Sequence, residues 1–159
     1  MENHINFVTS WLKDGSSHTV DVLTIYGIGG IGKTSLAKYV NGLYSHEFNT
    51  SNYIENITTK CDGKFNGLLV LQEQLCKDIS KTSSIKVHDV LVYTAKIDNA
   101  LARKRVFLVL DDISTLVQLD ALLGSKGFHP GSKGKGNLLG LTIDMCMLEK
   151  EKLGVSYEL

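Results

Sequence analysis

The stretch that decides the fold is Gly27-Ile28-Gly29-Gly30-Ile31-Gly32-Lys33-Thr34, which matches the pattern G-x-x-x-x-G-K-[ST] at every fixed position. A loop that wraps a polyphosphate turns its backbone N–H groups inward, and glycine adopts the backbone angles that this requires at low cost. A random chain with the composition of this one would contain the pattern about two times in a hundred. The stretch therefore predicts a phosphate-binding loop, and the alternative is a glycine-rich turn with an exposed lysine.

A strand and a helix are expected on either side of this loop. Residues 20–26 are mainly β-branched and apolar, which is typical of a buried strand. Apolar residues recur at helical spacing from Leu36 to Leu43 and predict a helix over residues 33–44. The N-terminus of that helix would add its unpaired N–H groups and its positive dipole end to the phosphate site.

The end of the loop carries residues with defined roles in this chemistry. Lys33 is expected to reach the β and γ phosphates as a point charge, and Thr34 to place its hydroxyl on Mg²⁺. Ser35 either assists or is an ordinary residue of the first helical turn. The predicted nucleotide-binding residues are Gly27, Ile28, Gly29, Gly30, Ile31, Gly32, Lys33, Thr34 and Ser35.

An apolar run, Val106 to Leu110, ends in the acidic pair Asp111 and Asp112. Such a run is typical of a strand in the middle of a parallel sheet. In P-loop nucleotidases an aspartate at the end of a hydrophobic strand in the same sheet holds the metal, directly or through water. By this rule Asp111 is assigned to Mg²⁺ together with Thr34. Asp112 either acts as the catalytic residue that positions the attacking water or caps a helix that starts near Ser114.

The rest of the chain alternates between strand and helix patterns. We expect a short amphipathic helix before residues 14–17, a strand over residues 52–57, and helices over residues 68–80 and 90–101. Strands that alternate with helices predict an α/β fold with a parallel sheet and right-handed crossovers. The predicted class is a P-loop NTPase-like, three-layer parallel sheet with flanking helices.

Composition excludes several other classes of protein. The 159 residues make one domain, and 17 basic residues balance 17 acidic ones, which argues against a nucleic-acid partner. The apolar runs are too short for membrane insertion, and the N-terminus lacks the pattern of a secretory signal, so the expected compartment is the cytoplasm. Cys61, Cys76 and Cys146 are odd in number and widely spaced, without a C-x-x-C pair, so we expect reduced thiols.

Two motifs together resemble a known family. Residues 27–36 (GIGGIGKTSL) and 104–113 (KRVFLVLDDI) are similar to the P-loop and second kinase motif of the NB-ARC domain in plant disease-resistance proteins. Residues 53–57 (YIENI) and 67–75 (GLLVLQEQL) are similar to a stretch typical of the TIR class. The resemblance covers about residues 4–133. It implies a signalling ATPase domain of the defence response that rests with ADP and is activated by exchange for ATP, with other immune receptors or signalling proteins as partners.

The chain departs from the family after Lys133. The family continues into a strand that ends in two threonines and a basic residue that senses the γ-phosphate, whereas here residues 134–137 intervene and no such ending appears. The resemblance thus implies a fold that is incomplete at its C-terminal end, truncated after the second kinase motif, and at most a slow ATPase. The expected organisation is a linker helix over residues 1–19, a nucleotide-binding domain over residues 20–133 and a divergent tail over residues 134–159.

In the family's sheet the missing strand lies between the P-loop strand and the strand before Asp111. Residues 138–148 are apolar enough to fill this position as a surrogate strand, although their Met and Leu content also allows a helix. We expect this segment to pack against the sheet between the two motif strands.

Two functions remain open. The first is a module that holds ADP or ATP with Mg²⁺ and acts as a nucleotide-dependent switch, with weak or no hydrolysis. The second is a truncated, non-catalytic fragment that pairs with full-length receptors through uncovered apolar surface, or a degenerate gene product. A small-molecule kinase has less support because no further basic cluster is placed to hold a second phosphorylated substrate. Guanine specificity lacks its N-K-x-D motif.

Overall fold

The computed structural model describes residues 2–13, 21–28, 30–48, 50–62, 66–80, 89–101, 106–123, 138–143 and 155–158. Their helices and strands follow in the order α1 (Glu2–Lys13), β1 (Asp21–Tyr26), α2 (Lys33–Tyr44), the 3-10 helix η1 (Ser45–Glu47), β2 (Thr50–Ile54), α3 (Ile57–Cys61), α4 (Gly67–Ser80), α5 (Val90–Leu101), β3 (Val106–Leu110), α6 (Leu116–Leu123), β4 (Leu138–Ile143) and β5 (Val155–Glu158). The alternation of strands and helices that the sequence predicts is confirmed.

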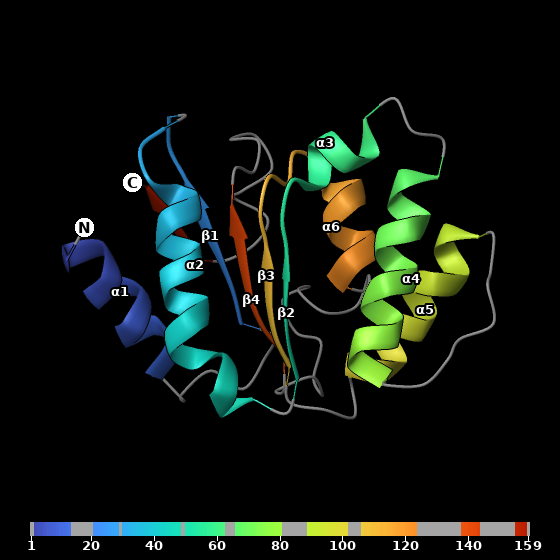
Figure 1. The fold of residues 1–159 in the computed structure, drawn as a ribbon, viewed down its shortest axis with the longest axis horizontal. Coiled ribbons are helices and arrows are strands. Elements are labelled where there is room, and N and C mark those ends of the chain that lie inside the picture. The colour runs from blue at the N-terminus through green and yellow to red at the C-terminus, as the bar shows by residue number, and fades with distance from the viewer. Residues whose placement is uncertain are drawn as a thin grey trace.

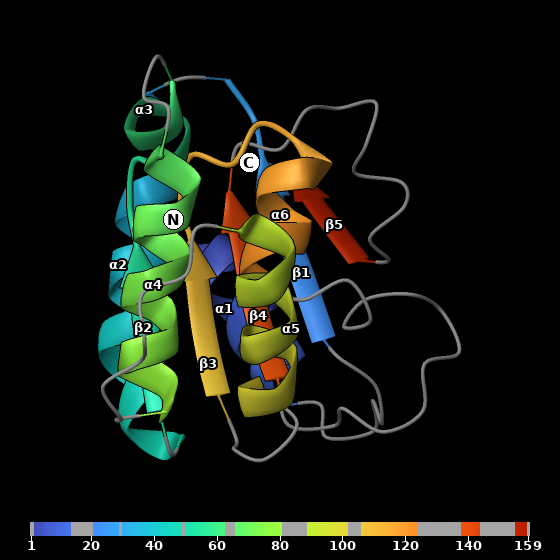
Figure 2. The same cartoon turned by 90° about the vertical axis from the view of Figure 1, so that its right-hand side faces the viewer.

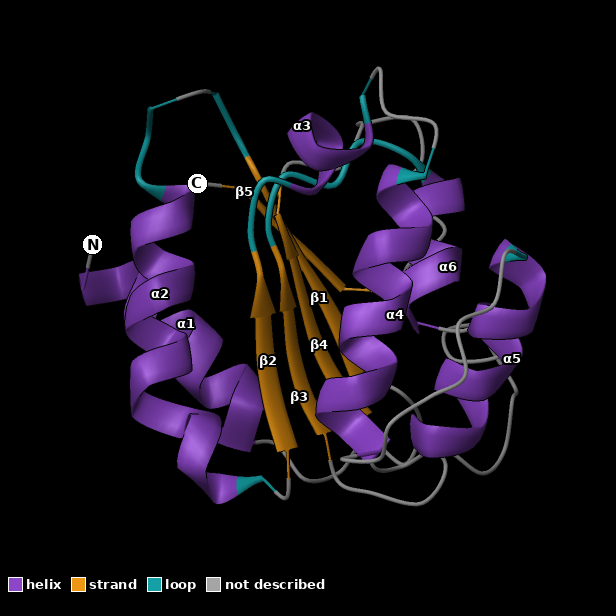
Figure 3. Ribbon diagram, turned by 45° about the vertical axis from the view of Figure 1, so that its right-hand side comes forward, coloured by secondary structure: helices purple, strands orange, loops and turns teal. Residues whose placement is uncertain are grey.

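These elements form three layers. The sheet lies in the middle, α1 and α2 cover one face, and α4, α5 and α6 cover the other (Figures 1 and 3). The short helix α3 lies at one end of the sheet (Figure 1). The predicted α/β class with a parallel sheet and flanking helices is therefore correct.

The sheet has five strands in the order β2-β3-β4-β1-β5. Every pairing is parallel. β4 lies between β1 and β3, and its Leu139 pairs with Asp21 on one side and with Phe107 on the other. This is the position expected for residues 138–148, of which residues 144–148 lie outside the described residues. The gap that an incomplete C-terminal end would leave at the centre of the sheet is filled by β4.

One predicted strand has different bounds in the structure, and one observed strand is not predicted. The strand expected over residues 52–57 runs from Thr50 to Ile54, because Asn56 takes a left-handed conformation with φ 56° and Ile57 begins α3. Asparagine tolerates this conformation better than most residues, so it ends the extended backbone there. The edge strand β5 pairs with β1 (Figure 2). It is not predicted from the sequence.

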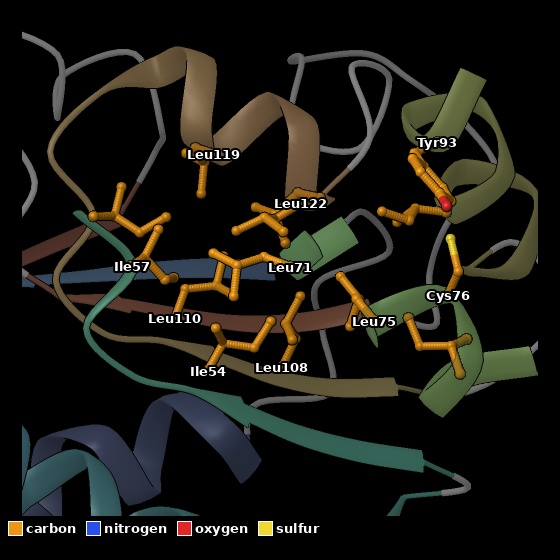
Figure 4. Packing of buried hydrophobic residues seen from close by; sticks show 14 of the residues in the cluster. Ile54, Ile57, Leu71, Leu75, Cys76, Tyr93, Leu108, Leu110, Leu119 and Leu122 are labelled. Atoms are coloured by element: carbon orange, nitrogen blue, oxygen red, sulfur yellow. The ribbon is translucent and has the colours of Figure 1, made fainter. Parts of the chain in front are cut away.

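Two apolar cores lie on opposite faces of the sheet, and β3 belongs to both. Val106, Leu108 and Leu110 face the core under α4, α5 and α6, whereas Phe107 and Val109 face the core under α1 and α2. This alternation follows from the two-residue period of a strand, and all five residues are fully buried. Figure 4 shows the first core, where Leu108 and Leu110 meet residues from α4 and α6: Leu71, Leu75, Leu119 and Leu122.

Helix α1 packs on α2. Val8 is fully buried in the second core, and the Tyr44 hydroxyl donates to Thr9 Oγ1 at 3.2 Å. The first helix thus contributes to the same core as the helix that follows the glycine loop. The domain boundaries proposed after residues 19 and 133 stay predictions.

Candidate functional site

The glycine loop and the acidic pair lie at the same edge of the sheet. The loop follows β1 and Asp111 follows β3, and the carboxyl ends of parallel strands meet at one edge, where ligands of open α/β sheets bind. Thr34 Oγ1 donates to Asp111 Oδ2 at 3.0 Å, although the two residues are 77 positions apart. The fold therefore brings together the two motifs that the sequence assigns to one site.

The loop has a backbone that favours glycine. Gly30 has φ 80° and Gly32 has φ 102°, both in the left-handed region. A Cβ built on Gly30 would meet nothing within 4 Å, so conformation rather than space selects glycine there. Ile28 and Ile31 are exposed. Gly29 lies outside the described residues.

Lys33 is buried against its own loop. Its side chain is only 5% exposed, and its Nζ donates to the Gly27 carbonyl at 2.8 Å and to the Ile28 carbonyl at 2.7 Å. The alternative of a turn with an exposed lysine is therefore wrong. An ammonium group that is held by two neutral carbonyls could form stronger, charge-assisted bonds with phosphate oxygens.

Asp111 is a buried carboxylate whose Oδ2 accepts hydrogen bonds from two hydroxyl groups. It is 4% exposed, and its Oδ2 accepts from Thr34 Oγ1 and, at 3.3 Å, from the Tyr53 hydroxyl. Its backbone N–H donates to the Ile54 carbonyl at 2.9 Å, which ties it to β2. Carboxylate and hydroxyl oxygens are hard ligands that suit Mg²⁺, so Thr34 and Asp111 fit the assigned cation.

Tyr53 is a site residue that reasoning on the motifs missed. Burial, followed by the charge of Asp111 and the hydrogen bond to it, raises the pKa of the Tyr53 hydroxyl well above its ordinary value. The hydroxyl therefore keeps its proton and acts as a donor to Asp111 at neutral pH. The signals in the sequence were its place in the strand expected over residues 52–57 and in the quoted stretch 53–57, and neither indicates a contact with Asp111.

Asp112 does not cap α6. The helix begins at Leu116, and Thr115 Oγ1 accepts from the N–H of Gln118 at 3.2 Å as its cap. Asp112 has φ 64°, and its side chain accepts from Thr59 Oγ1 at 3.3 Å, while its carbonyl accepts from the N–H of Thr58 at 2.9 Å. The capping alternative is wrong, and the role in water positioning stays a prediction. Ser35 is exposed in the first turn of α2, so its two alternatives, a helper in the phosphate site or an ordinary helical residue, also stay open.

The fold and these contacts define the class of the protein. A glycine loop that ends in Lys-Thr, with its threonine in contact with an aspartate at the end of another strand of the same sheet, is the arrangement of P-loop nucleotidases. The fold agrees, since the structure is similar to that of the Aeropyrum pernix ORC2 protein with a TM-score of 0.60 and 18% identity. The match covers 99% of this chain and 46% of that one.

The family follows from the sequence comparisons. The NB-ARC domain matches residues 1–128, and the chain belongs to this family. It is 34% identical to the disease resistance protein RUN1 of Vitis rotundifolia over 93% of this chain and 11% of that protein. It is 39% identical to the disease resistance protein RPV1 of the same species over 69% of this chain and 8% of that protein. The resemblance inferred from the motifs is confirmed.

One alignment with a relative runs over nearly the whole chain. The match with the disease resistance protein TAO1 of Arabidopsis thaliana, at 28% identity, covers 99% of this chain and 13% of that protein. The family match itself ends at residue 128, so the end of the resemblance near Lys133 stays a prediction. The chain spans about a tenth of the length of these relatives. None of the helices that the structure describes has the length and apolar character needed to cross a bilayer.

Proposed function

We propose that the chain is a module that binds ADP or ATP with Mg²⁺ at residues 27–35 and acts as a nucleotide-dependent switch in a plant immune receptor-like protein. The observation that carries the proposal is the contact of 3.0 Å between Thr34 Oγ1 and Asp111 Oδ2, beside the buried ammonium of Lys33. The ORC2 structure is described as ADPNP–ADP complexes, which supports nucleotide as the ligand class.

Each residue has a part in holding the nucleotide. Lys33 exchanges the carbonyls of Gly27 and Ile28 for oxygens of the β and γ phosphates, and the backbone of the loop supplies N–H donors around them. The hydroxyl of Thr34 and the carboxylate of Asp111 are the groups that would hold Mg²⁺. The cation would neutralise part of the polyphosphate charge.

Weak hydrolysis, or none, is part of the proposal. Charge that develops on the γ-phosphate is met by Lys33 and the cation, and the resemblance assigns no further sensor residue in this chain. Asp112 is the candidate for positioning water, and Thr59 holds its carboxylate. Single-turnover hydrolysis in the wild type and in Asp112→Asn measures this contribution, and we expect little turnover in either.

Thermal unfolding with and without Mg·ADP tests nucleotide binding. At a hundredfold excess over Kd, a bound ligand adds about 2.7 kcal/mol to the free energy of unfolding, which raises the Tm of a domain of this size by several degrees. We expect this shift in the wild type and its loss in Lys33→Ala. Lys38→Ala is the matched control, because Lys38 lies on the exposed side of the same helix and pairs with Glu55 at 3.4 Å. A wild type that shows no shift up to millimolar Mg·ADP would reject the proposal.

The second candidate is an interaction fragment that pairs with full-length receptors. Its support is an open apolar surface between α5 and α6, where Leu91 is 76% exposed and Val117 is 69% exposed beside a cavity of about 420 Å³. The centre of the sheet is not part of this surface, because β4 occupies it. Co-sedimentation with a longer NB-ARC protein, with and without Leu91→Asp, separates this function from nucleotide binding.

A further inference from the structure

Tyr53 reaches the carboxylate of Asp111 from the neighbouring strand. β2 pairs with β3 in a register that places Tyr53 opposite Val109 and Ile54 opposite Leu110. Residues at every second position of a strand share a face, so Asp111, two positions beyond Val109, lies on the face that carries Tyr53. The hydroxyl of Tyr53 spans this step and donates to Asp111 Oδ2 at 3.3 Å.

Packing fixes the ring of Tyr53 in this position. The side chain is partly buried and packs against the core that holds Phe107 and Val109. The hydroxyl has one proton, which it donates to Asp111 Oδ2 at 3.3 Å. Tyr53 is thus a fixed donor rather than a mobile surface side chain.

Tyr53 and Thr34 act on the same oxygen of Asp111. Thr34 comes from the first turn of α2 and Tyr53 from β2, and both hydroxyls donate to Oδ2. A carboxylate that is 4% exposed and held by donors from two elements is restrained in its rotation. Groups that orient a metal ligand in this way commonly change metal affinity by about tenfold to a hundredfold when they are removed.

We propose that Tyr53 is a positioning residue for the divalent-cation site, whose hydroxyl holds the Asp111 carboxylate in the orientation that serves Mg²⁺ beside Thr34. This inference rests on the proposed function. It adds a residue of β2 to a site otherwise built from the glycine loop and from the end of β3.

The test compares the affinity for ADP in excess Mg²⁺ with the affinity in EDTA. The ratio of these two affinities is the gain in ADP affinity that depends on the cation. We expect Tyr53→Phe to lower this gain about tenfold, the lower end of the range for such groups, and to leave the affinity in EDTA unchanged. Tyr44→Phe is the matched control, because it also removes a bonded hydroxyl, the one that donates to Thr9 at 3.2 Å between α1 and α2. It should leave both affinities unchanged.

A double-mutant cycle separates positioning from a general effect on the fold. In an Asp111→Asn background, Tyr53→Phe should cause no further loss of the gain from Mg²⁺, since the two residues act as a unit. A Tyr53→Phe variant that keeps the wild-type gain, or that loses affinity equally in Mg²⁺ and in EDTA, overturns the inference. A wild type that fails to bind ADP in either condition overturns the proposed function itself, which distinguishes the two failures.

Discussion

Gly32 is the residue at which the phosphate loop becomes helix α2. It is the N-cap, with φ 102° and ψ 14°, and its carbonyl accepts the first helical bond, from the N–H of Leu36 at 2.9 Å. A side chain in this left-handed region costs about 1–2 kcal/mol. We expect Gly32→Ala to lower the free energy of unfolding by about this amount, measured by urea denaturation at equilibrium.

Gly42 provides the control on the same helix. It lies in the interior of α2, and a Cβ placed on it would meet nothing within 4 Å. Because alanine is the better helix former, Gly42→Ala should raise the free energy of unfolding by about 0.5–1 kcal/mol. Equal effects of the two substitutions would show that the conformation of Gly32 is not what constrains it.

At the scale of single residues, the sequence predicts the part of the site that a local motif specifies. Lys33, Thr34 and Asp111 follow from spacing and from the rule that parallel strands end at one edge. Tyr53 does not follow from the motifs. Its contact with Asp111 depends on the register in which β2 pairs with β3, and the residue pattern of one strand does not specify that register. The choice between the two roles of Asp112, positioning water or capping a helix, also required the observed start of α6 at Leu116.

Among the elements, α4 is tied to both neighbouring helices by one side chain. Gln72 is fully buried, and its Nε2 donates to the Val90 carbonyl and to Thr94 Oγ1 on α5, each at 3.2 Å. It also donates at 2.9 Å to the carbonyl of Ala121, one of the last four residues of α6, whose carbonyls have no partner within their own helix.

Gln72→Leu removes these donors and keeps a side chain of similar length. The carbonyl of Ala121 would stay buried without this partner, so we expect a loss of about 1–3 kcal/mol in the free energy of unfolding. The measurement is urea denaturation, with Gln74→Leu as control, since Gln74 is an exposed glutamine on the same helix and should change stability by about 0.5 kcal/mol or less. A loss as small as that of the control would contradict the bridging role.

The longer helices are well predicted by the sequence, whereas the short helix α3 is not predicted. The bounds of α2 are the predicted ones, because several turns of periodic apolar residues specify a helix. The end of β2 was misplaced because the left-handed Asn56 interrupts a run of otherwise suitable residues. The four residues of β5 are too few to show a period of their own.

For the whole molecule, β1 depends on strands from the end of the chain. Its two neighbours are β4 and β5, both of which follow residue 137. We expect a chain that ends at residue 133 to show no cooperative urea transition by circular dichroism and no thermal shift with Mg·ADP. A chain that ends at residue 154 loses only the edge strand β5, so it should keep a cooperative transition at lower denaturant. A chain ending at residue 133 that unfolds like the full chain would contradict this role of β4.

The family resemblance predicted the strand order, including the central position that β4 occupies. The motifs predicted where a strand should lie, between the P-loop strand and β3, and they carried no information on whether the divergent residues after 133 could form it. Apolar content alone allowed strand or helix there, and the pairing of β4 with both neighbours resolves that ambiguity.

The placement of β4 also sets the order of events during synthesis. β1 leaves the ribosome before β4, and at roughly 5–20 residues per second the more than a hundred residues between them take about ten seconds to synthesise. Until then the strand that carries the phosphate loop has neither of its partners in the sheet. The nucleotide pocket is therefore among the last parts of the domain to assemble, and ligand capture by a nascent chain must wait for its C-terminal strands.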